Sequence, residues 1–193
     1  MKLMNILIAA FFLAGCGVQS IPQSKNGVEA ALAEVTNQYK RRIDLIPNLV
    51  KVVKGYASHE KETLEAVISA RAKATSVNID ASNITPEQMM AFQKAQGGLS
   101  SALGKLMVVS ERYSDLKANE NFQQLQSQLE GTENRIAIAR RRYIEAINSF
   151  NNLVTVPPTS FTNAVFYKYP KMPQFELSGE EKGKAEQAPQ IDL

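Results

Sequence analysis

Hydrophobic residues recur every three or four positions along most of this chain, which is the spacing of one buried face of an α-helix. Three such stripes run through residues 28–74, 89–113 and 122–154. Pro157 and Pro158 end the third stripe, because proline cannot continue a helix. Spacings that average close to 3.5 are typical of helices that pack side by side as in a coiled coil. The pattern therefore predicts long helices that bury one face each.

The first stripe keeps its register across Pro47, which lacks the N–H that would bond to the carbonyl of Ile43. The proline either kinks one continuous helix or starts a new one, for which Asp44 is a candidate cap. The unbroken stripe favours the kink. We expect an all-α fold, an elongated antiparallel helical bundle of three to four long helices over residues 28–156, with the first helix kinked or broken near Pro47.

The second helix has a clear predicted start. Thr85 is the expected N-cap, Pro86 occupies the first helical position, and Gln88 completes a capping box. Gly97 and Gly98 lie inside this stripe, where each glycine costs about 1 kcal/mol relative to alanine. We interpret the pair as a sign of a close helix crossing.

The N-terminus has the features of a lipoprotein signal peptide over residues 1–15. Lys2 precedes an apolar run at residues 6–13, which is too short to span a bilayer. Leu-Ala-Gly-Cys then resembles a bacterial lipobox, in which Cys16 would receive diacylglycerol and become the mature N-terminus. Cys16 is the only cysteine in the chain, so no disulfide framework competes for it. The alternative is an uncleaved hydrophobic anchor with an incidental cysteine.

We expect residues 16–27, rich in Gly, Ser, Gln and Asn, to form a lipidated N-terminus and a flexible tether. Gly17 stands where an aspartate resembles an inner-membrane retention signal, so a Gram-negative source would place the protein at the outer membrane. We therefore expect the protein to be a membrane-anchored lipoprotein of the bacterial cell envelope that faces the periplasm.

The C-terminal part divides in two. Residues 157–177 combine prolines with aromatic side chains and are expected to pack as an ordered tail on the end of the bundle. These aromatic residues are Phe161, Phe166, Tyr167, Tyr169 and Phe175. Residues 178–193 are rich in Gly, Glu, Lys and Gln, with little apolar mass, and are expected to be disordered.

Composition limits the chemistry. The 22 Lys and Arg residues nearly balance the 19 Asp and Glu residues, so a nucleic-acid partner is not indicated. With one His and no Trp, we expect no cofactor and no catalytic residue. His59 and Glu60 superficially match a zinc-protease helix, but Thr63 replaces the second histidine, and a di-iron bundle would need Glu where Tyr56 stands. No metal site is expected.

Polar residues near the helical stripes are the candidates for an interaction site or a structural polar network. Lys40, Arg41 and Arg42 beside Asp44 are expected to form local ion pairs, and a partner-binding groove at the proline is the alternative. His59 is expected to be a satisfied structural histidine, or to form with Glu60 a polar layer with Arg112, Glu133 or Arg140 of neighbouring helices. The full set is Arg41, Arg42, Asp44, Pro47, Asn48, His59, Glu60, Arg112, Glu133 and Arg140.

Three segments resemble the LemA family: RRIDLIPNLVKVVKGYASHE at 41–60, DLKANENFQQLQSQLEGTENRIAIARRRY at 115–143, and the aromatic, proline-rich stretch that follows the third stripe. The resemblance covers roughly residues 28–175. It implies an elongated antiparallel bundle held at a membrane and no established reaction, with membrane proteases or quality-control proteins as neighbours. Ser114 departs from the proline typical of the family, and the lipobox departs from the signal anchor of many relatives.

These observations lead to one main hypothesis and one alternative. The main hypothesis is a lipid-anchored, non-enzymatic protein of the cell envelope that acts as an interaction, accessory or scaffold module, through another envelope protein or through self-association. The alternative is a ligand-binding or enzymatic bundle that uses a buried polar layer around His59 and Glu60, with Arg42 and Glu133.

Overall fold

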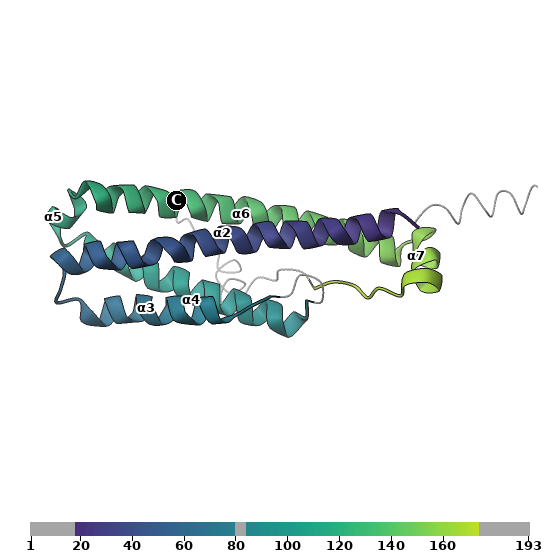
Figure 1. The fold of residues 1–193 in the computed structure, drawn as a ribbon, viewed down its shortest axis with the longest axis horizontal. Helices are drawn as coiled ribbons and strands as arrows, with labels where there is room; N and C mark the ends of the chain where they lie inside the picture. Colours follow the sequence, from purple (N-terminus) through teal and green to yellow (C-terminus); the bar gives the residue numbers. More distant parts are fainter. Residues whose placement is uncertain (1–17, 80–83, 174–193) are drawn as a thin grey trace, which may run out of the picture.

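The computed structural model of the protein describes residues 18–79 and 84–173, and these residues form an elongated antiparallel bundle of helices (Figure 1). The predicted all-α fold is confirmed. The long helices are α2 (Ser20–Tyr56), α3 (Lys61–Ser76), α4 (Pro86–Ser110) and α6 (Glu120–Thr155). Short elements follow at the two ends: α5 (Ser114–Lys117), α7 (Thr159–Thr162) and the π-helical turn η1 (Asn163–Tyr167).

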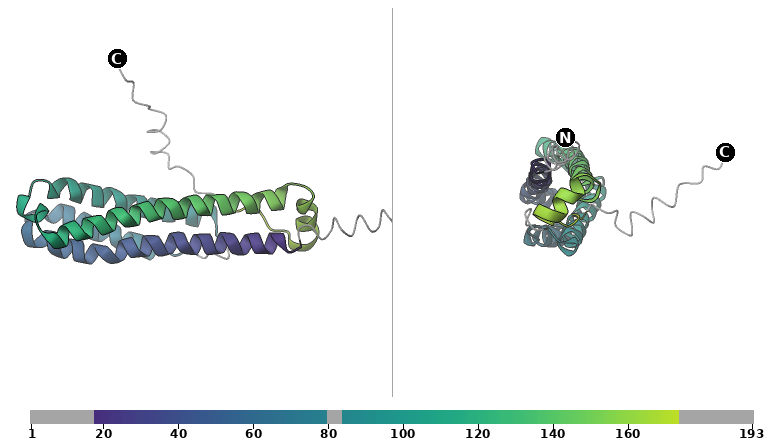
Figure 2. Two further views of the ribbon diagram at one scale, coloured as in Figure 1. Left: turned by 90° about the horizontal axis from the view of Figure 1, so that it is seen from above. Right: turned by 90° about the vertical axis from the view of Figure 1, so that its right-hand side faces the viewer.

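The two ends of the bundle differ. At the turn end, α2 is connected to α3, and α5 lies between α4 and α6. At the cap end, α7 and η1 lie across the end of the bundle close to the start of α2, as the end-on view of Figure 2 shows. Helices α2 and α6 run side by side along most of the bundle, and α3 packs along α4.

Pro47 does not break the first helix. Helix α2 continues through this proline to Tyr56, and the chain reverses direction at residues 57–60. The carbonyl that Pro47 leaves without its helical donor accepts a hydrogen bond instead, because Arg71 Nε on α3 lies 3.3 Å from the oxygen of Ile43. The helix is therefore continuous through Pro47, as the unbroken stripe favoured, and the alternative of a break there is wrong. The first stripe nevertheless belongs to two antiparallel helices, because the chain reverses beyond Tyr56.

Helix α2 also begins earlier than expected. It starts at Ser20, so residues 20–27 are helical and the prediction of a flexible tether over them is wrong. Ile21 is fully buried, and Pro22 is tolerated because it lies in the first turn, where the N–H has no helical acceptor. Cys16 and the rest of the expected signal peptide lie outside the described residues.

The core divides into two apolar clusters. The turn-end cluster joins residues 43–57, in α2 and just beyond it, to α3, to the second half of α4 and to the first half of α6. The cap-end cluster joins residues 21–39 of α2 to Met89 and Phe92 of α4 and to the second half of α6. Each helix buries its predicted stripe, so the apolar spacing accounts for most of the packing.

The start of α4 has the predicted chemistry. Thr85 accepts a hydrogen bond from the N–H of Gln88 at 3.2 Å, and the Gln88 side chain accepts one from the N–H of Thr85 at 3.1 Å. The capping box is confirmed. The close crossing expected at Gly97 and Gly98 is wrong, because a Cβ atom added at either position would meet open space.

The C-terminal tail packs only part of its aromatic side chains. Tyr167 stacks on Tyr169 with ring centroids 5.5 Å apart, and Tyr169 lies 6.1 Å from Phe150 of α6. Phe161 and Phe166, by contrast, are 69% and 66% exposed, so the expectation that they pack on the bundle is wrong. Phe175 and residues 178–193 lie outside the described residues. Within residues 18–79 and 84–173, no helix combines the length and apolarity needed to cross a membrane.

Candidate functional site

A buried arginine separates the two apolar clusters of the core. The side chain of Arg42 on α2 is only 2% exposed. Its Nη1 donates to Ser100 Oγ at 2.8 Å and to Glu133 Oε2 at 2.9 Å. Its Nη2 donates to the side-chain oxygen of Gln96 at 2.9 Å and to the backbone oxygen of Gln96 at 3.3 Å. Arg42 thus links α2, α4 and α6 at mid-length, instead of forming the expected local pair with Asp44.

An aromatic ring and a second arginine complete this polar layer. The guanidinium carbon of Arg42 lies 5.0 Å from the ring centroid of Tyr39, which meets Phe92 edge to face at 5.1 Å. Burial raises the pKa of Tyr39, while the charge of Arg140 and then that of Arg42 oppose this rise, and a hydrogen bond from Arg140 opposes it further. The candidates Arg42, Glu133 and Arg140 therefore do come together.

The donors and acceptors of this layer belong to the chain itself. Glu133 is 61% exposed, so its carboxylate keeps contact with water while the guanidinium of Arg42 is desolvated. Arg42 Nε is without a hydrogen-bond partner within the part of the chain that the structure describes. The layer therefore has the character of a buried structural network that joins three helices.

Glu60 and Arg112 form a second, separate cluster at the turn end. Glu60 Oε1 accepts hydrogen bonds from Arg112 Nη2 at 3.1 Å and from Tyr113 Oη at 2.9 Å. The hydrogen bond to Glu60 is the main cause that raises the pKa of Tyr113. His59 is exposed in the connection between α2 and α3.

Of the partners expected for Glu60, Arg112 is the one that it meets. The polar layer of the alternative hypothesis, in which His59 and Glu60 join Arg42 and Glu133, does not form. Arg42 lies 14 residues before the end of α2 at Tyr56, which is roughly 21 Å along a helix with a rise of 1.5 Å per residue. Among residues 18–79 and 84–173, no group of three or more His, Cys, Asp or Glu side chains is arranged to hold a metal ion.

A shallow groove follows the line where α2 and α6 lie side by side. Its larger part has a volume of about 560 Å³ and runs from mid-length toward the turn end. A second part of about 460 Å³ continues it toward the middle of the bundle, and Gln128 lines both parts. We call this surface the α2–α6 groove.

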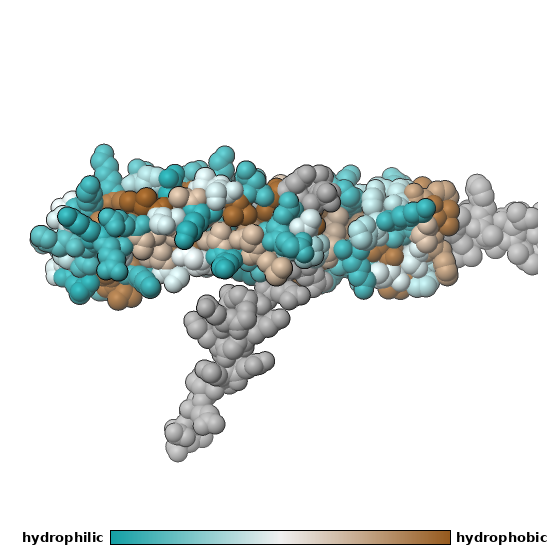
Figure 3. Space-filling view, turned by 90° about the horizontal axis from the view of Figure 1, so that it is seen from below, coloured by the Kyte–Doolittle hydropathy of each residue, from teal (hydrophilic) through white to brown (hydrophobic). Residues whose placement is uncertain are grey.

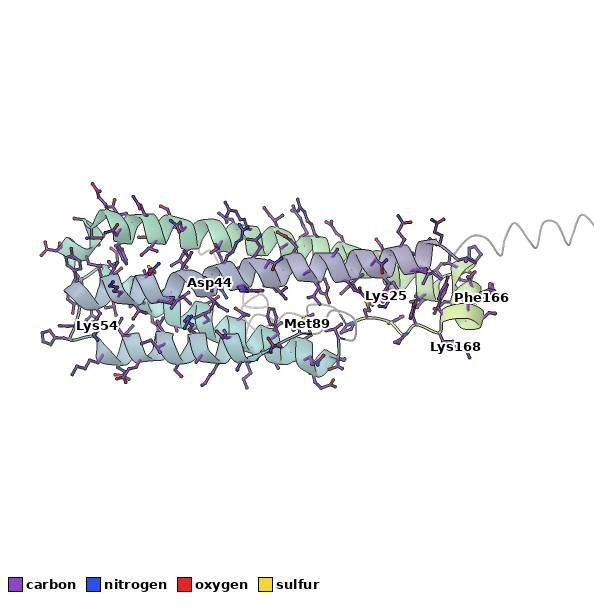
Figure 4. All side chains as sticks on the ribbon, in the orientation of Figure 1. Lys25, Asp44, Lys54, Met89, Phe166 and Lys168 are labelled. Carbon is purple, nitrogen blue, oxygen red and sulfur yellow. The ribbon has the colours of Figure 1, made fainter. Side chains whose placement is uncertain are left out.

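Most residues that line the α2–α6 groove have polar side chains, but the larger share of the surface that they expose to the groove is apolar. Its larger part is lined by Asn48, Lys51, Val52, Gly55, Tyr56, Asn119, Asn121, Gln124, Leu125 and Gln128. Its smaller part is lined by Arg41, Asp44, Leu45, Ser127, Gln128, Gly131, Thr132 and Arg135. Figure 4 shows Asp44 near the middle of α2. The candidates Arg41, Asp44 and Asn48 therefore share one surface, whereas Pro47 is exposed outside the lining.

Sequence reasoning missed several members of these sites. Gln96 and Ser100 hold Arg42 but were not among the candidates. Gln96 lies four residues after Phe92 and three before Leu99, so it is a polar residue within the buried stripe of α4. That position was the available signal for a polar layer.

Comparison with known proteins gives a consistent set of relatives. A family model described as the LemA family matches residues 31–193. Protein LemA of Metamycoplasma hominis is 27% identical over 164 residues, which cover 84% of this chain and 70% of that protein. Magnetosome proteins MamQ 2 and MamQ 1 of Paramagnetospirillum magneticum are each 27% identical over 143 residues, 63% of this chain. The matched stretch spans about half (51%) of each magnetosome protein.

Proposed function

The chain belongs to the LemA family, and on that premise we propose that it is a membrane-associated accessory protein of the bacterial cell envelope. In this proposal, acyl chains on Cys16 hold the protein at the membrane, and the bundle acts by binding another envelope protein and not by catalysis. One observation carries the proposal: α2 begins at the cap end at Ser20, four residues after Cys16 in the sequence, whereas the larger part of the α2–α6 groove lies toward the turn end.

The length of α2 indicates how far the anchored end of the bundle lies from its other end. Helix α2 has 37 residues, which corresponds to roughly 55 Å at 1.5 Å per residue. Figure 1 shows α2 spanning most of the distance between the cap end and the turn end. An anchor at the cap end leaves the α2–α6 groove free for a partner at the other end of the rod.

The chemistry of the groove supports a protein partner. Amide side chains such as Asn48, Asn121 and Gln128 present both donors and acceptors, and Tyr56 adds an aromatic surface that is 44% exposed. A shallow surface of this kind suits the polar and aromatic contacts of a protein interface better than the enclosure of a small substrate. The proposed partners are a membrane protease or quality-control protein, with a second copy of this chain as the alternative occupant.

The alternative of a ligand-binding or enzymatic bundle has weaker support. It requires Arg42, His59, Glu60 and Glu133 to face one cavity, but Arg42 is bonded within the core and His59 is exposed at the turn end. The two groups of residues therefore have no shared space in which to act on one substrate.

Site-specific photo-crosslinking in intact cells tests the proposal. A benzophenone amino acid replaces Gln128 in the α2–α6 groove, and the matched control replaces Val108, which is 71% exposed on α4 outside the groove. We expect a crosslinked envelope protein at position 128 and not at position 108. A crosslink to a second copy would select self-association, whereas recovery of the monomer alone at both positions would contradict the proposal.

A further inference from the structure

The cap end carries a group of exposed apolar side chains that the packing of the bundle does not require. Phe161 of α7 and Val165 and Phe166 of η1 are 69%, 69% and 66% exposed. Val156, just before this region, is 52% exposed, and Val18, just before α2, is 46% exposed. Figure 3 shows hydrophobic surface at this end of the molecule. Apolar side chains gathered in this way mark a surface that has an apolar partner.

Val18, at the start of the described residues, is hydrogen-bonded to this same surface. The hydroxyl of Tyr167 donates a hydrogen bond to the backbone oxygen of Val18 at 2.5 Å. Helix α2 begins only two residues later, at Ser20. The start of the bundle is therefore held against η1.

This attachment limits how far the cap end can lie from a lipid anchor. Cys16 precedes Val18 by two residues, and two residues span at most about 7 Å even when fully extended. A tether extending to residue 27 would have given the bundle much more freedom. Acyl chains on Cys16 would thus bring Val18, and the exposed residues of α7 and η1 beside it, to the bilayer surface.

The charges of the segment fit a bilayer with anionic headgroups. Residues 157–173 contain Lys168 and Lys171 and no Asp or Glu. Both lysines are exposed, and Figure 4 shows Lys168 close to Phe166 at the cap end. Basic side chains next to exposed aromatic ones are the usual composition of a surface that enters the headgroup region.

We propose that α7 and η1 form a membrane-contact surface, in which Phe161, Val165 and Phe166 enter the bilayer interface while Lys168 and Lys171 contact anionic headgroups. This inference rests on the proposed anchor at Cys16. The inference also predicts how the bundle is oriented. If the acyl chains on Cys16 and the side chains of α7 and η1 both contact the bilayer at the cap end, the long axis of the bundle points away from the membrane. A lipid anchor on Cys16 lies within about 7 Å of Val18, so the bilayer is the nearest apolar partner for this surface. For this reason we propose a bilayer and not a second protein.

Tryptophan fluorescence can test the contact, because the chain contains no natural Trp. Phe166→Trp places a single probe in the proposed surface, and Val108→Trp places a single probe at an exposed site of α4 toward the turn end. Each full-length variant is purified from membranes and reconstituted into vesicles of phosphatidylcholine and phosphatidylglycerol. Half of the vesicle preparations contain lipids with brominated acyl chains, which quench only those tryptophans that contact them.

We expect blue-shifted, strongly quenched emission from Phe166→Trp and unquenched emission from Val108→Trp in protein that floats with the vesicles. Equal quenching at both positions, or no quenching at position 166 in floating protein, would overturn the membrane-contact surface and leave the anchor intact. Protein that fails to float with the vesicles would overturn the anchor itself, and the inference would fall with it.

Discussion

Arg42 and Glu133 form an ion pair of 2.9 Å whose two members have opposite environments: the arginine is 2% exposed and the glutamate is 61% exposed. Desolvation of the guanidinium is costly, and the bonds to Ser100, Gln96 and Glu133 offset that cost. Because these partners lie on α4 and α6, a shift of any one helix would remove one or more acceptors from a buried charge. We therefore interpret the layer as the feature that fixes the register of α2, α4 and α6.

Loss of the buried arginine should strongly destabilise the bundle. Arg42→Ala leaves a cavity and an unsatisfied Gln96, and we expect it to lower the free energy of unfolding by about 3 kcal/mol or more. The matched control Arg41→Ala removes an exposed neighbour and should change stability by less than about 0.5 kcal/mol. Urea denaturation followed by circular dichroism measures both. Equal effects of the two substitutions would contradict the proposed role of the layer.

Pro47 and Arg71 should show energetic coupling. Pro47→Ala restores an N–H for the carbonyl of Ile43 and removes an interior proline, so we expect stabilisation of about 1 to 3 kcal/mol. Arg71→Met should cost about 1 kcal/mol in the native background, because the Ile43 oxygen then loses its donor.

A double-mutant cycle separates this coupling from other effects of the two side chains. In the Pro47→Ala background, the cost of Arg71→Met should become smaller, since the backbone supplies the donor. If the two substitutions are strictly additive in thermal and urea denaturation, the hydrogen bond from Arg71 does not compensate for the proline.

A glycine of α4 offers a stabilising substitution. A Cβ atom at Gly98 meets open space, so Gly98→Ala should raise the free energy of unfolding by about 1 kcal/mol through helix propensity alone. Thermal unfolding of the full chain measures the effect. A clear loss of stability would show that a close contact exists at this position.

The bundle should lose stability at high pH through a buried tyrosine. Burial raises the pKa of Tyr143 to about 12 from the ordinary value of 10.0. The unfolded chain therefore releases this proton first, so the contribution of Tyr143 is intact below pH 10 and is lost as the pH rises toward 12. Tyr143→Phe should make the decline in unfolding free energy between these pH values less steep. Identical slopes for the native chain and the variant would contradict the raised pKa.

The apolar stripes predicted the helices but not where the first one ends. Val53 of α2 and Leu64 of α3 both face the core, and the spacing continues through the reversal at residues 57–60 as if one helix ran on. Periodicity reports which side of a helix is buried, and it does not report the direction of the chain. The cost of Pro47 within a helix follows from the sequence, whereas the donor that compensates for it comes from Arg71, which is distant in sequence.

The polar sites, too, could be predicted only in part, because their partners come from other helices. Arg42, Glu133 and Arg140 could be named as candidates for a polar layer between helices, but Gln96 and Ser100, which bind Arg42, lie on another helix and were missed. Likewise, the α2–α6 groove depends on which two helices run side by side, so Asn48 could be named but not Gln128. Local sequence identified individual polar residues, and tertiary packing decided which of them meet.

The most direct test of the account is the location of a Cys16→Ser variant of the full chain. Membrane and soluble fractions are separated after a high-salt wash, and acylation is followed in parallel by metabolic labelling with a fatty acid. The account predicts that the native chain is labelled and stays with the membrane, while Cys16→Ser is unlabelled and appears in the soluble fraction. Retention of unlabelled Cys16→Ser in the membrane at the native level would contradict lipid anchoring and favour an uncleaved hydrophobic anchor.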